Sequence, residues 1–220
     1  MEKIRIFIQY FMYVFVLIIA FGVMLVNNRV NNIQNSNSHF KEYSYPIDCM
    51  REAELSYWEN KYLLTLEVQN YINSVTPYSN LRGYAIVDEC EDYDVDIIFV
   101  LTQAQLESHF GTKGIGSKIN NVFNVGVFDG LSSDKVNKHY KFNYPNQSIK
   151  PYLELLTTKY LVNKTEHDLM SKYVDTNGKR YASDPDYESK FKSKYEHIKN
   201  TTKIDSLQLV MKSYALKCNR

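Results

Sequence analysis

The sequence predicts a mainly α-helical domain preceded by one transmembrane helix. Three observations lead to this fold class. An uninterrupted apolar run occupies residues 6–26, near the amino terminus. Over most of residues 50–220, apolar residues recur at spacings of three and four, which is the period of amphipathic helices. Residues 95–108 are apolar on every side of a helix, which predicts a buried central helix.

The composition allows one core and excludes several classes of protein. The chain has 220 residues, enough for one domain with an appendage. Lys and Arg total 26 against 25 Asp and Glu, so the basic excess of a nucleic-acid-binding protein is missing and we expect no nucleic-acid partner. Three cysteines exclude a disulfide-stapled miniprotein. The 19 tyrosines are unusual, and they offer many flat amphipathic surfaces.

The apolar run at residues 6–26 has the length of a membrane span. It contains about 21 residues, and Gln9 is its only clearly polar side chain. No small-x-small cleavage site follows, so we expect an uncleaved signal anchor rather than a signal peptide. Lys3 and Arg5 favour a cytoplasmic location for residues 1–5. The sequence thus predicts a single-pass membrane protein, held in the lipid bilayer by this run, with its main domain on the extracytoplasmic side.

The rest of the chain divides into a stalk, a domain and a tail. Residues 27–49 are rich in Asn and Ser without an apolar period, which is typical of a linker. We expect a catalytic domain over residues 50–200, and a helix and tail over residues 201–220. The alternative for the amino-terminal run is a buried core helix, but such a helix is rarely the first element of a chain.

Helices are predicted in order along the domain, with one irregular lobe between them. Pro77 ends the first helix, and Asp94 or Asp96 can cap the third. Residues 111–147 break the helical period with glycines and asparagines, so we expect a small loop or β-hairpin lobe there. The predicted helices cover residues 52–75, 81–91, 95–108, 148–161, 186–199 and 204–216.

Glu107 is the residue whose surroundings point to chemistry. It lies at the carboxyl end of the most apolar predicted helix and is followed by Ser108. Apolar surroundings and the negative end of the helix dipole both favour the protonated form of a carboxyl group. A protonated carboxyl at neutral pH is what glycosidic cleavage needs as a general acid. The alternative is an ordinary helix-terminal Glu paired with a lysine such as Lys113.

Four segments in order resemble a known family. Residues 102–111, TQAQLESHFG, are similar to the A-Q-x-x-L-E-S-G-W-G segment of bacterial glucosaminidases of the autolysin and flagellar-muramidase type, in glycoside hydrolase family 73. Residues 120–123, NNVF, resemble the family's N-N-L-F. Residues 148–156 resemble its S-I-x-D-Y-x-x-L-L helix, and residues 181–187, YASDPDY, resemble its Y-A-T-D-P-x-Y.

The resemblance implies a lysozyme-like helical domain with a cleft. It also implies hydrolysis of the β-1,4 bond after N-acetylglucosamine in peptidoglycan, with glycan strands as the partner and no cofactor. Glu107 would be the general acid, and Tyr181 would position the sugar or the attacking water; the alternative for Tyr181 is packing. The residues that would contact or shape the substrate site are Asn121, Phe123, Phe110 and Tyr187.

The chain also departs from the family pattern. His109-Phe110 replaces the family's G-W, and Asn124 replaces the glycine that follows N-L-F. Glycosidases normally need a second group, and the only acids between residues 124 and 144 are Asp129 and Asp134. Either aspartate could supply that group, or the substrate's acetamido group could assist, or activity could be weak.

Two other functions remain open at this stage. A lytic transglycosylase needs a single catalytic Glu, although no G-L-M-Q-like segment follows E-S here. A catalytically weak wall-binding module could use tyrosines to stack on sugars. No metal is expected, because the histidines show no ligand spacing. Cys49 and Cys90 could form a disulfide outside the cell if they are close.

Overall fold

The computed structural model describes residues 45–127 and 130–217. The predicted membrane span, residues 6–26, and most of the predicted stalk lie outside these ranges. Among the helices that the structure describes, none is long and apolar enough to cross a membrane. The described residues from Cys49 onward form one compact unit.

The domain is mainly α-helical, as predicted. Within the described ranges no β-strand forms, and the one isolated antiparallel bridge joins Val174 and Arg180. The α-helices are α2 (Tyr45–Val75), α3 (Gly83–Asp92), α4 (Ile97–Ser108), α5 (Gly114–Ile119), α6 (Ile149–Leu155), α7 (Glu166–Ser171), α8 (Tyr187–Thr201) and α9 (Ile204–Lys217). Shorter helical turns are η2 (Lys138–Tyr140), η3 (Pro145–Ser148) and the π-helical η4 (Leu156–Tyr160).

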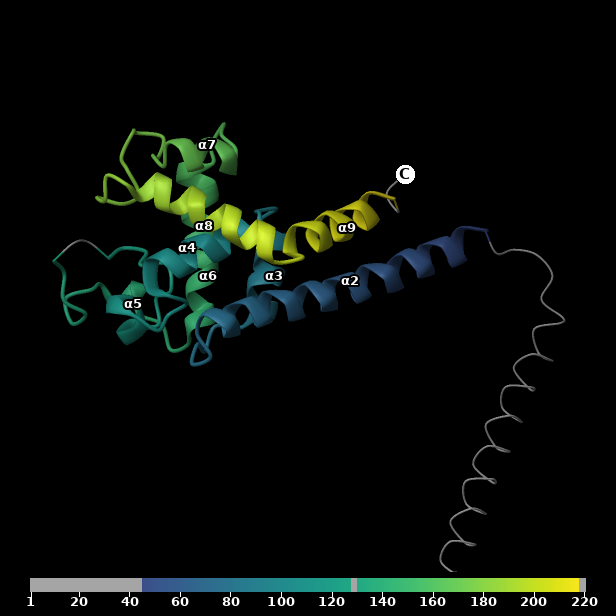
Figure 1. The fold of residues 1–220 in the computed structure, drawn as a ribbon, viewed down its shortest axis with the longest axis horizontal. Helices are drawn as coiled ribbons and strands as arrows, with labels where there is room; N and C mark the ends of the chain where they lie inside the picture. Colours follow the sequence, from purple (N-terminus) through teal and green to yellow (C-terminus); the bar gives the residue numbers. More distant parts are fainter. Residues whose placement is uncertain (1–44, 128–129, 218–220) are drawn as a thin grey trace, which may run out of the picture. The chain divides into compact units, whose positions relative to one another are not determined.

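Helix α4 is the buried centre of the domain, which confirms the prediction for residues 95–108. It packs against α3, α5, α8 and α9, and Figure 1 shows it between α5 on one side and α7 and α8 on the other. Residues 97–104 are all buried. Asp96 caps the helix by accepting a hydrogen bond from the Ile98 N–H at 2.7 Å. The same carboxylate accepts a second bond from the Tyr195 hydroxyl at 2.6 Å, which ties α8 to the start of α4.

The carboxyl end of α4 is closed by two left-handed residues. His109 has φ 53° and Phe110 has φ 57°. The His109 N–H donates to the Gln105 carbonyl and the Phe110 N–H donates to the Ala104 carbonyl, both at 3.0 Å, which satisfies carbonyls of the last helical turn. Glycine is the usual residue at such a position, because a Cβ atom is strained there. The chain therefore accepts backbone strain where the helix ends at Ser108, one residue after Glu107.

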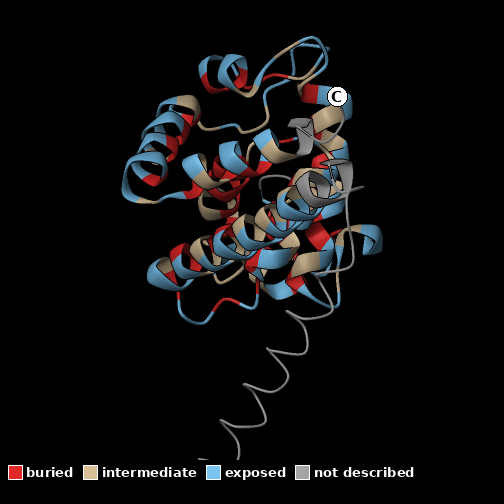
Figure 2. Cartoon of the chain, turned by 90° about the vertical axis from the view of Figure 1, so that its right-hand side faces the viewer, coloured by how far each residue is buried: buried red, intermediate tan, exposed pale blue. Residues whose placement is uncertain are grey.

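An aromatic cluster joins α8 to α4 and places many of the tyrosines. Phe191 of α8 packs on Phe99 of α4 with ring centroids 4.6 Å apart, and both rings contact Tyr173 at 5.7 Å. Tyr173 is fully buried and stacks on Tyr181 at 4.9 Å. Figure 2 shows such buried residues on the inward faces of the helices, with exposed residues on the outward faces.

The lobe at residues 111–147 contains no β-hairpin in its described part, which corrects that alternative of the prediction. It contains α5, η2 and η3 instead. The amide of Asn121 organises it, since Nδ2 donates to the carbonyls of Val125 and Tyr140 at 2.9 and 3.0 Å. Left-handed residues at Asn120 and Asn124 turn the backbone away from an extended path. Hydrogen bonds from a side chain thus take the place of the backbone hydrogen bonds that would join the strands of a hairpin.

Other predicted boundaries shift by a few residues. Helix α2 begins at Tyr45 instead of residue 52, and so it includes the last part of the predicted stalk. Pro46 is compatible with this start, because the N–H groups of a first helical turn have no helical partner. Helix α3 begins at Gly83, where a Cβ atom would lie 2.8 Å from the carbonyl oxygen of Thr65 in α2. Helix α7 has no counterpart among the predicted helices.

Candidate active site

Three separate parts of the chain converge on the Glu107 carboxyl group. Glu107 lies in the last turn of α4 and is half-buried. Its Oε1 accepts hydrogen bonds from the Tyr187 hydroxyl at 2.6 Å and from Gln103 Nε2 at 3.2 Å. Its Oε2 accepts a bond from Asn124 Nδ2 at 3.1 Å. Three donors on its two oxygens hold the carboxyl group in one orientation.

Gln103 and Tyr187 form a closed triangle with Glu107. Gln103 lies one helical turn before Glu107 and is fully buried. Its Nε2 also donates to the Tyr187 hydroxyl at 2.7 Å. Gln103 Oε1 is buried and has no hydrogen-bond partner among the described residues. Tyr187 was predicted as a site residue and Gln103 was not, although an amide four residues before the acid on an apolar helix was a usable signal.

Asn124 holds Glu107 from the opposite side. Its Nδ2 donates to the backbone carbonyl of Glu107 at 2.8 Å as well as to the carboxylate. Its backbone has φ 51°, in the left-handed region. Its Oδ1 faces Gly116 of α5, where a Cβ atom would lie 2.9 Å from it and 2.5 Å from the Asn121 carbonyl oxygen. Asn124 was predicted only as the replacement of a family glycine, whereas its side chain contacts the candidate acid.

Tyr181 and Tyr187 act as hydrogen-bond donors in this site. The Tyr181 hydroxyl donates to the Phe123 carbonyl at 2.8 Å, and its ring stacks on that of Tyr187 with centroids 6.2 Å apart. Burial, and then the negative charge of Glu107, raise the pKa of Tyr181 well above its ordinary value of 10.0. The same two causes raise the pKa of Tyr187. Both hydroxyls therefore keep their protons at neutral pH, so neither can serve as a base.

Three of the predicted substrate-contacting residues are fully buried instead. Phe123 stacks face to face on Tyr152 with centroids 4.1 Å apart, and Phe110 packs edge-on against Tyr71 at 6.0 Å. Asn121 is also buried, and its amide serves the lobe backbone. None of these side chains has a surface with which to touch a sugar, so we assign them to packing beneath the site.

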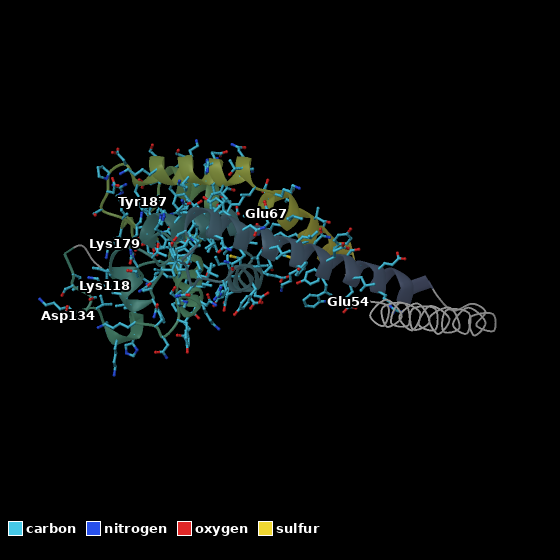
Figure 3. The ribbon with its side chains drawn as sticks, turned by 60° about the horizontal axis from the view of Figure 1, so that its bottom comes forward. Glu54, Glu67, Lys118, Asp134, Lys179 and Tyr187 are labelled. Atoms are coloured by element: carbon cyan, nitrogen blue, oxygen red, sulfur yellow. The ribbon has the colours of Figure 1, made fainter. Side chains whose placement is uncertain are left out.

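Only one of the two lobe aspartates lies among the described residues. Asp129 lies outside the described residues. Asp134 is exposed, and Figure 3 places it at the outer edge of the lobe, well apart from Tyr187. A hydrogen bond from the Ser132 side chain, followed by backbone hydrogen bonds, lowers the pKa of Asp134. Its carboxylate is therefore a weak base at the place where the structure has it.

Metal ligands and disulfides add little to the site. Over residues 45–127 and 130–217, no group of three His, Cys, Asp or Glu side chains is placed to hold a metal ion. Cys90 is a buried free thiol, and burial raises its pKa well above its ordinary value of 9.0. The side chain of Cys49, its suggested partner, lies outside the described side chains.

The comparisons with known proteins bear on residues 83–200. A family model described as mannosyl-glycoprotein endo-beta-N-acetylglucosaminidase matches this stretch, from α3 to the end of α8. The stretch contains Glu107 and the three residues that bind its carboxyl group, Gln103, Asn124 and Tyr187. A comparison with curated proteins finds no match.

Proposed function

Because the chain belongs to the mannosyl-glycoprotein endo-beta-N-acetylglucosaminidase family, whose model matches more than half of it, we propose that Glu107 is its general acid. The family makes the chain a glycoside hydrolase that acts on peptidoglycan, and the helical domain fits a lysozyme-like α fold. The bond that we propose it cleaves is the β-1,4 bond after N-acetylglucosamine. The observation that carries this proposal is the convergence of Tyr187, Gln103 and Asn124 on one carboxyl group.

The proposed first step is proton transfer from Glu107 to the glycosidic oxygen. The bond between the anomeric carbon and that oxygen breaks, and its electron pair stays on the leaving oxygen, which takes the proton. The sugar left behind becomes oxocarbenium-like. Glu107 becomes an anion, and the donors on Tyr187 and Asn124 are already aimed at its two oxygens. No reorganisation of the site is needed as this charge develops.

The proposed second step is attack on the oxocarbenium-like carbon by water. A second group must position or deprotonate that water, unless the acetamido oxygen of the substrate forms the new bond first. Of the two lobe aspartates we favour Asp129, because Asp134 is exposed at the lobe edge and its carboxylate is engaged by Ser132. Tyr181 supports the site by fixing the Phe123 backbone beneath it.

The role of Glu107 is tested by Glu107→Gln in the full-length chain, with clearing of a peptidoglycan suspension as the assay. General acid catalysis contributes about 10²- to 10⁴-fold, so we expect a loss within that range. Glu196→Gln on exposed α8 surface is the matched control, and it should keep full activity. If Glu107→Gln clears the suspension as fast as the unchanged protein, Glu107 is not the acid.

We also propose that residues 6–26 anchor the chain in the cytoplasmic membrane with the domain outside. The support for this is the length and apolarity of the run. Anchoring is tested by an alkaline wash of isolated membranes, which should leave the chain in the membrane pellet. Orientation is tested by adding protease to cells whose outer membrane face is exposed, which should cut the domain. Leu17→Arg at the centre of the run should weaken membrane retention, since an arginine there costs about 2.5–3.5 kcal/mol. Release of the unchanged chain by the wash would refute the anchor.

A further inference from the structure

A surface groove lies on the flank of the α4–α8 pair, next to the proposed catalytic residue. Its volume is about 540 Å³. One wall is Leu106, the residue directly before Glu107 on α4. The other wall is a stripe of α8 whose members recur at helical spacings of one, three and four. The α8 residues that line this groove, which we call the α8 groove, are Ser189, Lys190, Ser193, Lys194 and His197.

The α8 groove is lined by cationic and hydroxyl groups. No carboxylate is among its described lining residues. Lys190 Nζ contacts Asp184 Oδ2 at 2.5 Å, so part of its charge is neutralised. Lys194 is half-buried in the groove, and within the part of the chain that the structure describes it makes no ion pair. The hydroxyls of Ser189 and Ser193 can donate hydrogen bonds beside this charge.

The positive charge of Lys194 acts on His109, which lies close in sequence to the proposed catalytic residue. His109 follows Glu107 by two residues at the end of α4. Burial lowers the pKa of His109, and the positive charges of Lys113 and Lys194 lower it further. Lys113 and Lys194, from different parts of the chain, therefore both exert their positive charge on His109. Lys194, the half-buried lysine of the groove, attracts an anion more strongly than a fully exposed lysine does.

We propose that the α8 groove binds a carboxylate of the peptide stems that peptidoglycan carries, an inference that rests on the proposed function. Peptide stems hang from alternate sugars of a glycan strand, and their residues and free termini bear carboxylates. Leu106 of the groove directly precedes Glu107 on α4, so the proposal places a stem of a strand bound at Glu107 within reach of the groove. Lysine and serine donors are suited to a carboxylate. The groove would thus select glycan strands that still carry peptides.

The test compares Lys194→Glu with Lys192→Glu in the full-length chain. Lys192 is exposed on the same helix and does not line the groove, so it controls for the change in net charge. Two substrates are used, both freed of phosphate polymers by acid extraction: peptidoglycan with its peptides, and strands stripped of peptides by an amidase. Lys194→Glu should raise the half-saturating concentration of the first about fivefold, equivalent to about 1 kcal/mol, and leave that of the second unchanged.

Several results would overturn the proposal. Equal effects on both substrates, no effect on either, or the same effect from Lys192→Glu would each remove the groove from peptide recognition. An effect that appears only on walls that keep their phosphate polymers would assign the groove to phosphate. Sedimentation of each variant with the two substrates separates this proposal from the catalytic one. If nothing is cleaved but Lys194→Glu alone loses binding to peptide-bearing strands, the proposed function fails and the groove assignment stands.

Discussion

Asn124→Gly separates the contact that Asn124 makes with Glu107 from the backbone turn at the same residue. Asn124 has φ 51°, a conformation that glycine adopts freely. The substitution therefore keeps the turn while it removes the Nδ2 donor from Glu107 Oε2 and from the Glu107 carbonyl, at 3.1 and 2.8 Å. It also removes Asn124 Oδ1, a buried acceptor with no partner among the described residues.

The expected magnitudes differ for activity and for stability. A hydrogen bond to a charged group contributes about 1.5–3 kcal/mol, and the bond to Oε2 is long and only half-buried, so its loss should cost about 1.4 kcal/mol, or tenfold in rate. The free energy of unfolding should change by less than about 1 kcal/mol. Two effects of the substitution stabilise the fold: the left-handed strain is relieved and the unpaired acceptor is removed. Two effects destabilise it: the hydrogen bonds are lost, and glycine gives the unfolded chain more freedom.

The assay is the rate of clearing at saturating peptidoglycan, with urea unfolding of the same samples. Asn163→Gly is the control, because Asn163 is exposed with φ 57° and isolates the backbone effect. Asn163→Gly should leave the rate unchanged. A rate for Asn124→Gly within twofold of the unchanged protein would refute the positioning role. A loss of stability of 2 kcal/mol or more, about the full cost of a buried contact, in step with the rate would make Asn124 structural instead.

Three further predictions follow from particular contacts. His109→Gly should raise the free energy of unfolding by about 0.5–1 kcal/mol in urea titrations, because φ 53° strains His109 but not glycine; a decrease would show that the imidazole contributes more than the strain. Asp129→Asn should lower clearing activity far more than Asp134→Asn, and equal mild losses would favour assistance by the substrate. Burial by itself would raise the pKa of Glu188, but hydrogen bonds from its own N–H, Arg180 and the Tyr173 N–H outweigh burial, so the pKa lies below its ordinary 4.5. A lowered pKa stabilises the fold above about pH 4.5, and this stabilisation is lost as the pH falls through the folded pKa. Glu188→Gln should therefore lower the free energy of unfolding by roughly 1 kcal/mol at neutral pH, and the difference from the unchanged protein should close in acid. A difference that does not depend on pH would contradict this origin.

The elements that the sequence predicted best are those with the strongest local signals. The all-round apolar character of residues 97–104 is enough to identify the buried helix, because few other places in a domain accept such a segment. Asp96 was one of two proposed caps, and the structure selects it. Tyr187 was found through a motif, and its hydroxyl lies on Glu107. Each of these predictions used a signal from residues close together in the chain, although the Tyr187–Glu107 contact itself joins distant residues.

The site features that the sequence did not predict depend on contacts between distant residues. Asn124 and Glu107 meet only because α5 packs through Gly116 on the end of α4, and nothing in either segment alone requires it. Phe110 and Phe123 looked like cleft aromatics, yet both rings face inward, since a motif specifies residue types and not the direction in which side chains point. Part of the tyrosine excess is explained by Tyr173, whose ring contacts Phe99 of α4, Phe191 of α8 and Tyr181 of the segment between α7 and α8.

Mass spectrometry of the soluble products from peptidoglycan digested by the full-length chain tests the central claim most directly. Hydrolysis after N-acetylglucosamine with Glu107 as the acid predicts fragments with N-acetylglucosamine at the reducing end, and their loss in Glu107→Gln. Fragments that end in 1,6-anhydro-N-acetylmuramic acid would show a transglycosylase instead. Binding to peptidoglycan without any soluble product would contradict catalysis and leave a wall-binding module.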